Sequence, residues 1–248
     1  MGQDDDFTAQ ASRWDRWAPF YDDDSRGHLR PDEAVDALAA SAGDGPVLEL
    51  GIGSGRLALP LAKLGLRVDG VDASPQMIDR LQAAAGDLPI RAQVADMADF
   101  DTGTDRYPLI FVAASSLFML GDQQRQVSCF RSVAAALAPG GQFLVEAATP
   151  AGVAGPPLAV RHVDDGHVRV TLQTHDPVEQ LMRSQELQLD VDGGWRMLPA
   201  VRRYASPAEL DLMAQLAGLQ RHARYGSWSM SPFTAASTRH VSAYGSPR

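Results

Sequence analysis

The sequence predicts an α/β fold built on a mostly parallel sheet, with a smaller antiparallel part inserted late in the chain. An apolar run at residues 47–50, a glycine-rich loop, a helical pattern and a second apolar run ending at Asp72 form a strand–loop–helix–strand unit. Further apolar runs alternate with helical patterns at residues 89–94, 107–113 and 142–147. Residues 158–204 instead alternate with a period of two, which is typical of antiparallel strands.

Composition and charge limit the classes of protein to which the chain can belong. Its 248 residues, with 45% hydrophobic and 21% charged side chains, fit one soluble domain with an elaboration. A net charge of −9 disfavours binding to nucleic acid, which needs clustered positive charge. No apolar run is long enough to span a membrane, and the acidic start is unlike a targeting peptide. We expect a cytoplasmic protein.

Three kinds of chemistry lack the residues that they need. The single Cys129 allows neither a disulfide framework nor a zinc site made of cysteines. Lys63 is the only lysine, and it lies in the helical pattern after the glycine loop, so a P-loop or a Schiff base is not expected. No metal-binding spacing of histidines or carboxylates occurs, and we predict no metal.

The N-terminal part predicts a helical arm. From Thr8 an apolar helical spacing leads to the aromatic stretch that ends at Tyr21, and a charged loop, residues 22–30, follows. Trp14 and Trp17 either contact a ligand or attach the arm to the domain. Pro31 opens a second helix to about residue 42, because proline is favoured in the first helical turn.

The glycine loop predicts a nucleoside site. Gly51, Gly53 and Gly55 let the backbone turn sharply and approach a ligand, and the following helix start offers free N–H groups. Asp72 lies 21 positions after Gly51, near the spacing of about 20 at which such folds place an acid that binds ribose hydroxyls. Position 56 is arginine, so the loop departs from the dinucleotide-binding pattern G-x-G-x-x-G.

The loop, with Glu49 before it, resembles the first motif of the class I S-adenosylmethionine (SAM)-dependent methyltransferases. Ala73, Ser74, Pro75 and Met77 are similar to the second motif of that family, and Ser74 and Pro75 predict the cap and the first residue of a helix. LAPGGQFLVE at residues 137–146 is similar to the family's turn into the fifth strand. The resemblance implies a Rossmann-like fold with a seven-stranded sheet whose final strand is antiparallel. It also implies that SAM is the cofactor.

Further cofactor contacts follow from the same resemblance. Met77 either packs on the adenine or fills the core. Asp96 is at the position where the family accepts a hydrogen bond from the adenine amino group, and Met97 is placed to pack on the ring. The end of the fourth strand, Ala113, is expected under the methyl donor, since ligands in such sheets bind beyond the carboxyl ends of strands.

The acceptor side is marked less clearly. Ser115, Ser116 and Phe118 follow the fourth strand and are our candidates for contact with the acceptor. Trp228 lies in a late loop that either lines an apolar pocket or packs on itself. These positions predict a small-molecule acceptor and do not identify it.

The arm supplies the candidates for catalysis and closure. Many small-molecule methyltransferases cover the cofactor with an N-terminal helix that ends in Tyr-Asp, and residues 21–22 resemble that element. Tyr21 is therefore a candidate cofactor contact and catalytic residue, because an aromatic ring suits a sulfonium and a hydroxyl can reach the acceptor. His28 is the second catalytic candidate, and Arg30 a candidate for the cofactor's carboxylate; a solvated loop is the alternative.

The chain is predicted to divide into three parts. Residues 1–44 form a helical lid, residues 45–149 and 205–248 the SAM-binding domain, and residues 150–204 an antiparallel insertion. The insertion begins with a Pro-, Gly- and Ala-rich stretch, residues 150–157, which predicts a linker. In layout the chain looks like the sugar N-methyltransferases of antibiotic biosynthesis, in which such an insertion covers the substrate and forms a subunit interface. That resemblance implies a homodimer or a higher homo-oligomer.

Methyl transfer is an in-line displacement for which the enzyme mainly supplies alignment and a dry site. Oxygen acceptors often need a base, whereas amines need only be held neutral, and the sequence offers no compelling base. This favours an amine acceptor, such as an amino sugar or another secondary metabolite. The alternatives are an O- or C-methyltransferase, a SAM-binding protein that does not methylate, and an NAD-dependent dehydrogenase, which the glycine spacing disfavours.

Overall fold

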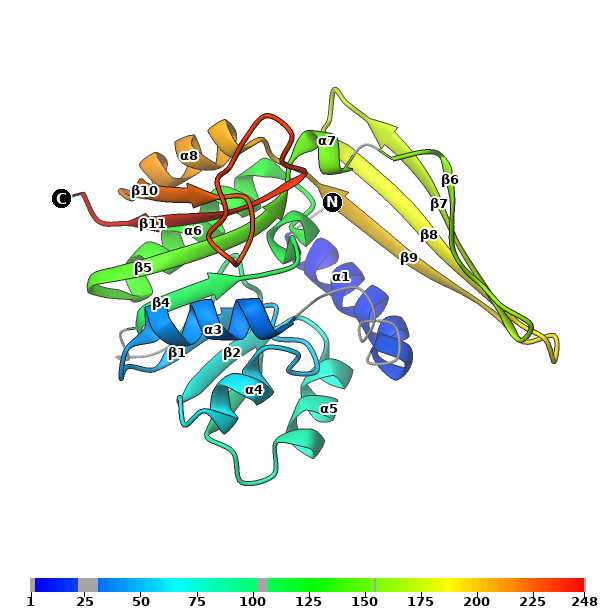
Figure 1. The fold of residues 1–248 in the computed structure, drawn as a ribbon, viewed down its shortest axis with the longest axis horizontal. Helices are drawn as coiled ribbons and strands as arrows, with labels where there is room; N and C mark the ends of the chain where they lie inside the picture. Colours follow the sequence, from blue (N-terminus) through cyan, green and yellow to red (C-terminus); the bar gives the residue numbers. More distant parts are fainter. Residues whose placement is uncertain (1–2, 22–30, 102–106, 154, 248) are drawn as a thin grey trace.

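The computed structural model describes residues 3–21, 31–101, 107–153 and 155–247. Seven strands form the main sheet, in the order β10-β11-β5-β4-β1-β2-β3 (Figure 1). The strands are β1 (Val47–Leu50), β2 (Val68–Asp72), β3 (Ile90–Val94), β4 (Tyr107–Val112), β5 (Leu137–Ala148), β10 (Gln220–Tyr225) and β11 (Arg239–Gly245). Strands β3, β2, β1, β4 and β5 pair in parallel, and β11 pairs antiparallel with both β5 and β10. The predicted fold class is therefore confirmed.

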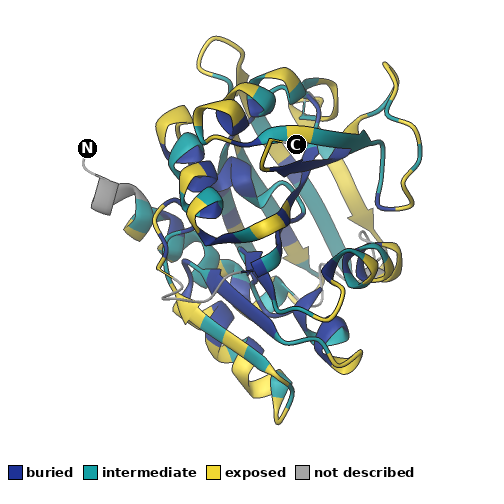
Figure 2. Cartoon of the chain, turned by 90° about the vertical axis from the view of Figure 1, so that its left-hand side faces the viewer, coloured by how far each residue is buried: buried dark blue, intermediate teal, exposed yellow. Residues whose placement is uncertain are grey.

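Helices cover both faces of the main sheet. The helices are α3 (Pro31–Ala42), α4 (Ala58–Lys63), α5 (Pro75–Ala85), α6 (Gln123–Ala136) and α8 (Pro207–Leu216). One core cluster joins α6 and α8 to the sheet through the aromatic contacts of Phe130 with Phe143 and Tyr244, at ring-centroid distances of 5.3 and 5.5 Å. The other joins α3, α4 and α5 to the opposite face. Figure 2 shows the resulting pattern, with buried strands enclosed by helices that are exposed on their outer sides.

The antiparallel insertion is a separate four-stranded sheet in the order β6-β7-β8-β9. Its strands are β6 (Leu158–Val163), β7 (His167–Asp176), β8 (Leu181–Asp190) and β9 (Trp195–Arg203). All its ladders are antiparallel, as the period of two predicts. The short helix α7 (Pro150–Val153) lies in the segment that the sequence predicts as a linker. Figure 1 shows this sheet extending away from the main one beyond the end of β5.

The N-terminal helix α1 (Gln3–Trp17), with the short 3₁₀ helix η1 (Ala18–Phe20), lies between the two sheets (Figure 1). It packs against α5 on one side and against β9 on the other. The Ser74 hydroxyl donates to the Asp15 carboxylate at 2.5 Å, and the Trp17 indole N–H donates to the Pro199 carbonyl at 3.2 Å. The predicted arm is therefore attached to both parts of the protein.

Several predicted boundaries are wrong, for local reasons. The helix after the glycine loop begins at Ala58 rather than near residue 56, because the positive φ of Gly55 keeps the chain in a turn. Strand β5 begins at residue 137, since the Pro-Gly-Gly stretch forms an irregularity inside the β4–β5 ladder and not a turn before it. The arm helix begins at residue 3, ahead of its first apolar residue. Within the described residues, no helix combines the length and apolarity that a membrane crossing requires.

Candidate active site

The glycine loop joins the end of β1 to α4 and lies at the carboxyl edge of the sheet. All three glycines have positive φ, and a Cβ on Gly51 would come within 3.1 Å of the Ser116 Cβ. A Cβ on Gly55 would come within 2.4 Å of Leu81, whereas one on Gly53 would meet nothing within 4 Å. The loop therefore packs tightly on two sides and leaves its backbone open at Gly53, as a ligand cradle requires.

Asp72 at the end of β2 is tied to this loop. One carboxylate oxygen accepts from the Gly53 N–H and the other from the Ser74 N–H, both at 2.9 Å. Burial raises the pKa of Asp72, backbone hydrogen bonds oppose that rise, and Asp15 adds to it. Ser74 caps α5 by accepting from the Met77 N–H at 3.1 Å, which confirms the predicted helix start. The carboxylate thus faces the open side of the loop, where the ribose acceptor is expected.

Glu49 on β1 is 4% exposed, and its Oε2 has no hydrogen-bond partner among the described residues. Burial raises its pKa to about 8, the Arg56 charge opposes the rise, and the Asp72 charge adds to it. Buried carboxylates normally have partners, so an orphaned oxygen needs an explanation. A positively charged ligand bound at the glycine loop would explain it, because its charge would pair with this carboxylate.

Tyr21, at the end of the arm, lies over the glycine loop and lines the same cavity as Gly51 and Gly53. Burial raises the pKa of its hydroxyl, and the Arg56 guanidinium, which donates a hydrogen bond to that hydroxyl, opposes the rise. The Trp14 ring contacts Tyr21 edge-on, with centroids 6.1 Å apart. Arg56 was not among the sequence candidates; its only signal was its position directly after the third glycine.

These groups enclose what we call the glycine-loop cavity, which has a volume of about 40 Å³. It is lined by Gln10, Trp14, Tyr21, Gly51, Gly53, Asp72, Ala73, Met77, Met97, Ser116 and Met119. Pockets that hold small molecules usually measure about 300–1,000 Å³. The cavity in this conformation is therefore smaller than a nucleoside, and its wall, to which Gln10, Trp14 and Tyr21 of the arm belong, has to open to admit one.

Asp96 does not line this cavity. Its carboxylate pairs with the Arg125 guanidinium at 2.6 Å and accepts from the Ala98 N–H at 2.9 Å. The Arg125 side chain is only 3% exposed and needs a counter-ion, which Asp96 supplies. The structure thus brings Met97 to the cavity as expected but turns Asp96 toward helix α6. Ala113 is buried at the end of β4 and does not line the cavity either.

A strained turn follows β4 and separates two cavities. Ala114 and Ser115 have φ of 52° and 61°, which is unusual for residues with side chains. Glu146 holds the turn by accepting from the Ala114 N–H at 2.8 Å, and the Ser115 hydroxyl accepts from the Ala148 N–H at 2.9 Å. As a result Ser116 lines the glycine-loop cavity, and Ser115 faces the opposite way.

Ser115 and Phe118 line a second cavity, of about 420 Å³, between the main sheet and the insertion. We call it the arginine cavity, because Arg161, Arg169 and Arg202 line it. Its other lining residues are Trp17, Ala114, Ala148, Gly152, Val153, Thr171, Gln173, Met182, Ser184 and Glu186. Alternation along β7 and β8 puts these polar side chains on one face of the insertion, a signal that was present in the sequence but not used.

The remaining candidates lie elsewhere. Trp228 is 8% exposed and packs in the core cluster on the α3 side, so the expectation that it lines the acceptor pocket is not supported. His28 and Arg30 lie outside the described residues.

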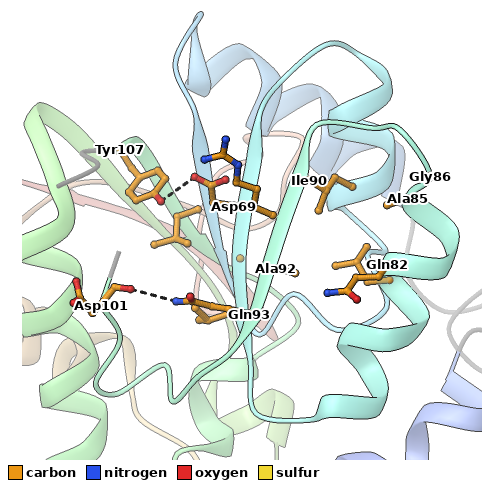
Figure 3. Close-up of a pocket in the computed structure, with 14 residues that line it drawn as sticks. Asp69, Gln82, Ala85, Gly86, Ile90, Ala92, Gln93, Asp101 and Tyr107 are labelled. Carbon is orange, nitrogen blue, oxygen red and sulfur yellow. Dashed lines mark hydrogen bonds between the residues drawn. The ribbon is translucent and has the colours of Figure 1, made fainter. Parts of the chain in front are cut away.

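A further cavity, of about 690 Å³, lies at the β3 edge of the main sheet and was not predicted. It wraps around the edge strand β3, as Figure 3 shows. The Tyr107 hydroxyl donates to the Asp69 carboxylate at 2.9 Å, and the Gln93 amide donates to the Asp101 carbonyl at 3.2 Å (Figure 3). We call it the edge cavity. Its lining residues run along β2 and β3, and none of them lines the glycine-loop cavity.

Known proteins share both the motifs and the fold. A family model described as a methyltransferase domain matches residues 47–141. A cypemycin N-terminal methyltransferase from a Streptomyces species is 31% identical over 199 residues, which cover 77% of this chain and 79% of that protein. The structure of the CcbJ methyltransferase from Streptomyces caelestis superposes with a TM-score of 0.89 at 35% identity, covering 96% of this chain and 99% of that one.

A more distant structure shares the fold. SAM-bound CalS10, an amino pentose methyltransferase from Micromonospora echinaspora, superposes with a TM-score of 0.71 at 20% identity over 88% of this chain and 92% of that one. The glycine loop, the seven-stranded sheet and the relatives agree, and they exclude the dehydrogenase alternative. The chain belongs to the SAM-dependent methyltransferases and acts on a small molecule.

Proposed function

We propose that this methyltransferase transfers the methyl group of SAM to an amine nitrogen of a small secondary metabolite, such as an amino sugar. The observation that carries this proposal is the chemistry of the arginine cavity. Among its described lining residues there is no histidine or lysine, and its one acid, Glu186, lies 3.8 Å from the Arg169 guanidinium. Such a site suits an acceptor that needs no base.

The residues of the glycine loop fit SAM. Asp72 would accept from the ribose hydroxyls, and Met77 and Met97 offer apolar surface for the adenine. Ionised Glu49 would face the positive charges of the cofactor. SAM supplies the electrophilic methyl group, while the protein fixes its direction and excludes water.

The acceptor cavity favours a neutral amine. Arg161, Arg169 and Arg202 exceed the single carboxylate of Glu186, and nearby positive charge lowers the pKa of an amine. The amine would then keep its lone pair for attack on the methyl carbon. Ser115, at the mouth of the cavity beside the glycine loop, is our candidate for orienting the nitrogen.

The relatives support nitrogen as the acceptor atom. The cypemycin enzyme is named for methylation of an N-terminus, and CalS10 for an amino pentose. We keep Tyr21 as a candidate for contact with both cofactor and acceptor, since it lines the glycine-loop cavity. O- or C-methylation and SAM binding without methylation remain the alternatives.

We also propose the three-part organisation with its original boundaries: residues 1–44, residues 45–149 with 205–248, and residues 150–204. The insertion covers the acceptor cavity with one face and exposes apolar side chains on the other, among them Val160, Leu172, Leu189 and Met197. That outer face supports the proposal of a homo-oligomer. The proposed location is the cytoplasm.

A product analysis tests the acceptor. The enzyme is incubated with SAM labelled with ¹³C in its methyl group and a panel of amine and hydroxyl metabolites, and the products are examined by NMR. We expect an N-methyl signal from amino-bearing members. O-methyl signals alone would contradict the proposal, and so would the absence of transfer to any member by protein that binds SAM.

A further inference from the structure

The arginine cavity carries charge that methyl transfer to an amine does not require. The protein as a whole has a net charge of −9, yet three guanidinium groups gather in a cavity of about 420 Å³ around one carboxylate. All three come from the insertion, on strands β6, β7 and β9. They lie across the cavity from Ser115 and Phe118, which come from the main domain.

Neutral groups hold two of these arginines. The Arg161 Nε donates to the Thr171 hydroxyl at 2.9 Å, and an Arg202 amino group donates to the Ser184 hydroxyl at 3.3 Å. The third arginine is Arg169, whose Nε lies 3.8 Å from Glu186, the only carboxylate among the described residues of the cavity wall. Among the described lining residues, three guanidinium groups thus face one carboxylate, which leaves two positive charges without a balancing acid in the wall.

Arg202 is the most costly of the three to keep there. Burial lowers its pKa, the charge of Glu186 opposes that effect, and the charge of Arg161 adds to it. Arginine nevertheless stays protonated, because its pKa is far above neutral. A buried cation is unfavourable unless a negative group compensates it.

We propose that the acceptor carries an anionic oxygen group, a carboxylate or a phosphate, which Arg161 and Arg202 bind while its amine faces the methyl donor. This inference rests on the proposed function, because it takes the arginine cavity to be the acceptor site. Guanidinium groups form paired hydrogen bonds with such anions, and the neighbouring hydroxyls of Thr171 and Ser184 offer further donors.

The anion would fix the direction of the acceptor. Its negative end is held by the insertion, and its amine is left at the turn between the two cavities, next to Ser115. Trp17, Phe118 and Met182 provide apolar surface for the part between the two groups. The site would accordingly select molecules with an amine and an anion at opposite ends.

Binding to paired probes tests the proposal without requiring turnover. The full-length protein, loaded with S-adenosylhomocysteine (SAH), is titrated in ligand-observed NMR with 6-aminohexanoate and its amide, and with glucosamine 6-phosphate and glucosamine. We expect at least one anionic member to bind about tenfold more tightly than its neutral partner. A preference within the first pair assigns a carboxylate, and one within the second a phosphate.

Variants locate the effect. Arg202→Gln and the more exposed Arg161→Gln should each weaken binding of the preferred anion about five- to tenfold and leave its neutral partner unchanged. Arg183→Gln is the matched control: it removes the same charge from β8, between Met182 and Ser184, and therefore from the opposite, exposed face. Thermal melts confirm that each variant is folded.

The proposal is overturned if neither anionic probe binds better than its neutral partner, or if both cavity variants bind the anion as the control does. Binding of SAH, measured separately by calorimetry, reports on the cofactor site alone. A product methylated on oxygen would contradict the proposed function and leave these binding ratios as they are. The two failures are thus distinguishable.

Discussion

We predict that Glu49 makes SAM binding depend on pH. Its buried carboxyl group has a pKa raised to about 8, so at pH 7 about 90% of the molecules carry the proton. The sulfonium and ammonium of SAM favour the ionised form, and an opposite charge at close range lowers a pKa by about 1–3 units. With a fall of about 2 units, only about 10% stays protonated, and about 0.8 proton leaves when SAM binds.

The same numbers give the effect on affinity. A carboxyl group whose pKa falls from about 8 to about 6 strengthens binding about tenfold at pH 7, about 90-fold at pH 9 and hardly at all at pH 5. Glu49→Gln imitates the protonated carboxyl and should lose this gain. The Kd of the variant should therefore equal that of the wild type at pH 5 and exceed it increasingly as the pH rises.

Calorimetry in buffers with different ionisation enthalpies measures both quantities. The number of protons released is the slope of the observed enthalpy against the buffer enthalpy, and the difference between wild type and Glu49→Gln removes the contribution of SAM's own amino group. A difference below about 0.1 proton, with equal Kd values at pH 9, would refute the assignment of Glu49 to the cofactor's positive charges.

Two further predictions concern the same cavity. Asp72→Ala should weaken SAM binding by about 1–3 kcal/mol, because the ribose hydroxyls lose a charged acceptor that also holds the loop at Gly53. Calorimetry measures the Kd, and an unchanged value would show that Asp72 does not bind the ribose. Tyr21→Phe should lower kcat about tenfold, as measured by steady-state rates. It should change the free energy of unfolding in urea by less than about 1 kcal/mol, because only the hydrogen bond from Arg56 is lost. Equal rates would show that the hydroxyl has no part in turnover.

Local patterns made much of the fold predictable. The glycine loop, the Ser-Pro helix start and the period-two alternation each depend on neighbouring residues, and all three occur as expected. The boundary near residue 56 was missed because the positive φ of Gly55 prolongs the turn. The boundary near residue 137 was missed because the irregularity there depends on pairing with β4, which is distant in sequence. Helix α7 was missed because its proline and glycine residues are typical of irregular linkers.

The site was less predictable, because its polar contacts join residues far apart in the sequence. Asp96 was expected to face the adenine, but its carboxylate accepts a hydrogen bond from Arg125. The packing of α6 brings Arg125 to that position, and the sequence around Asp96 does not indicate it. The partner of Asp15 is Ser74, 59 positions later. The arginine cavity forms where one face of the insertion meets the ends of β4 and β5, and alternation alone does not tell which face of a sheet turns inward.

A crystal structure of the protein with SAH tests most directly the central claim that the cofactor lies on the glycine loop and points its sulfur at the arginine cavity. We expect the ribose at the Asp72 carboxylate, the adenine between Met77 and Met97, and the sulfur beside the turn at Ser115 and Ser116. Tyr21 should have moved from its present place in the glycine-loop cavity. SAH bound in the edge cavity, beside Asp69 and Gln93, or with its sulfur turned away from that turn, would contradict the claim.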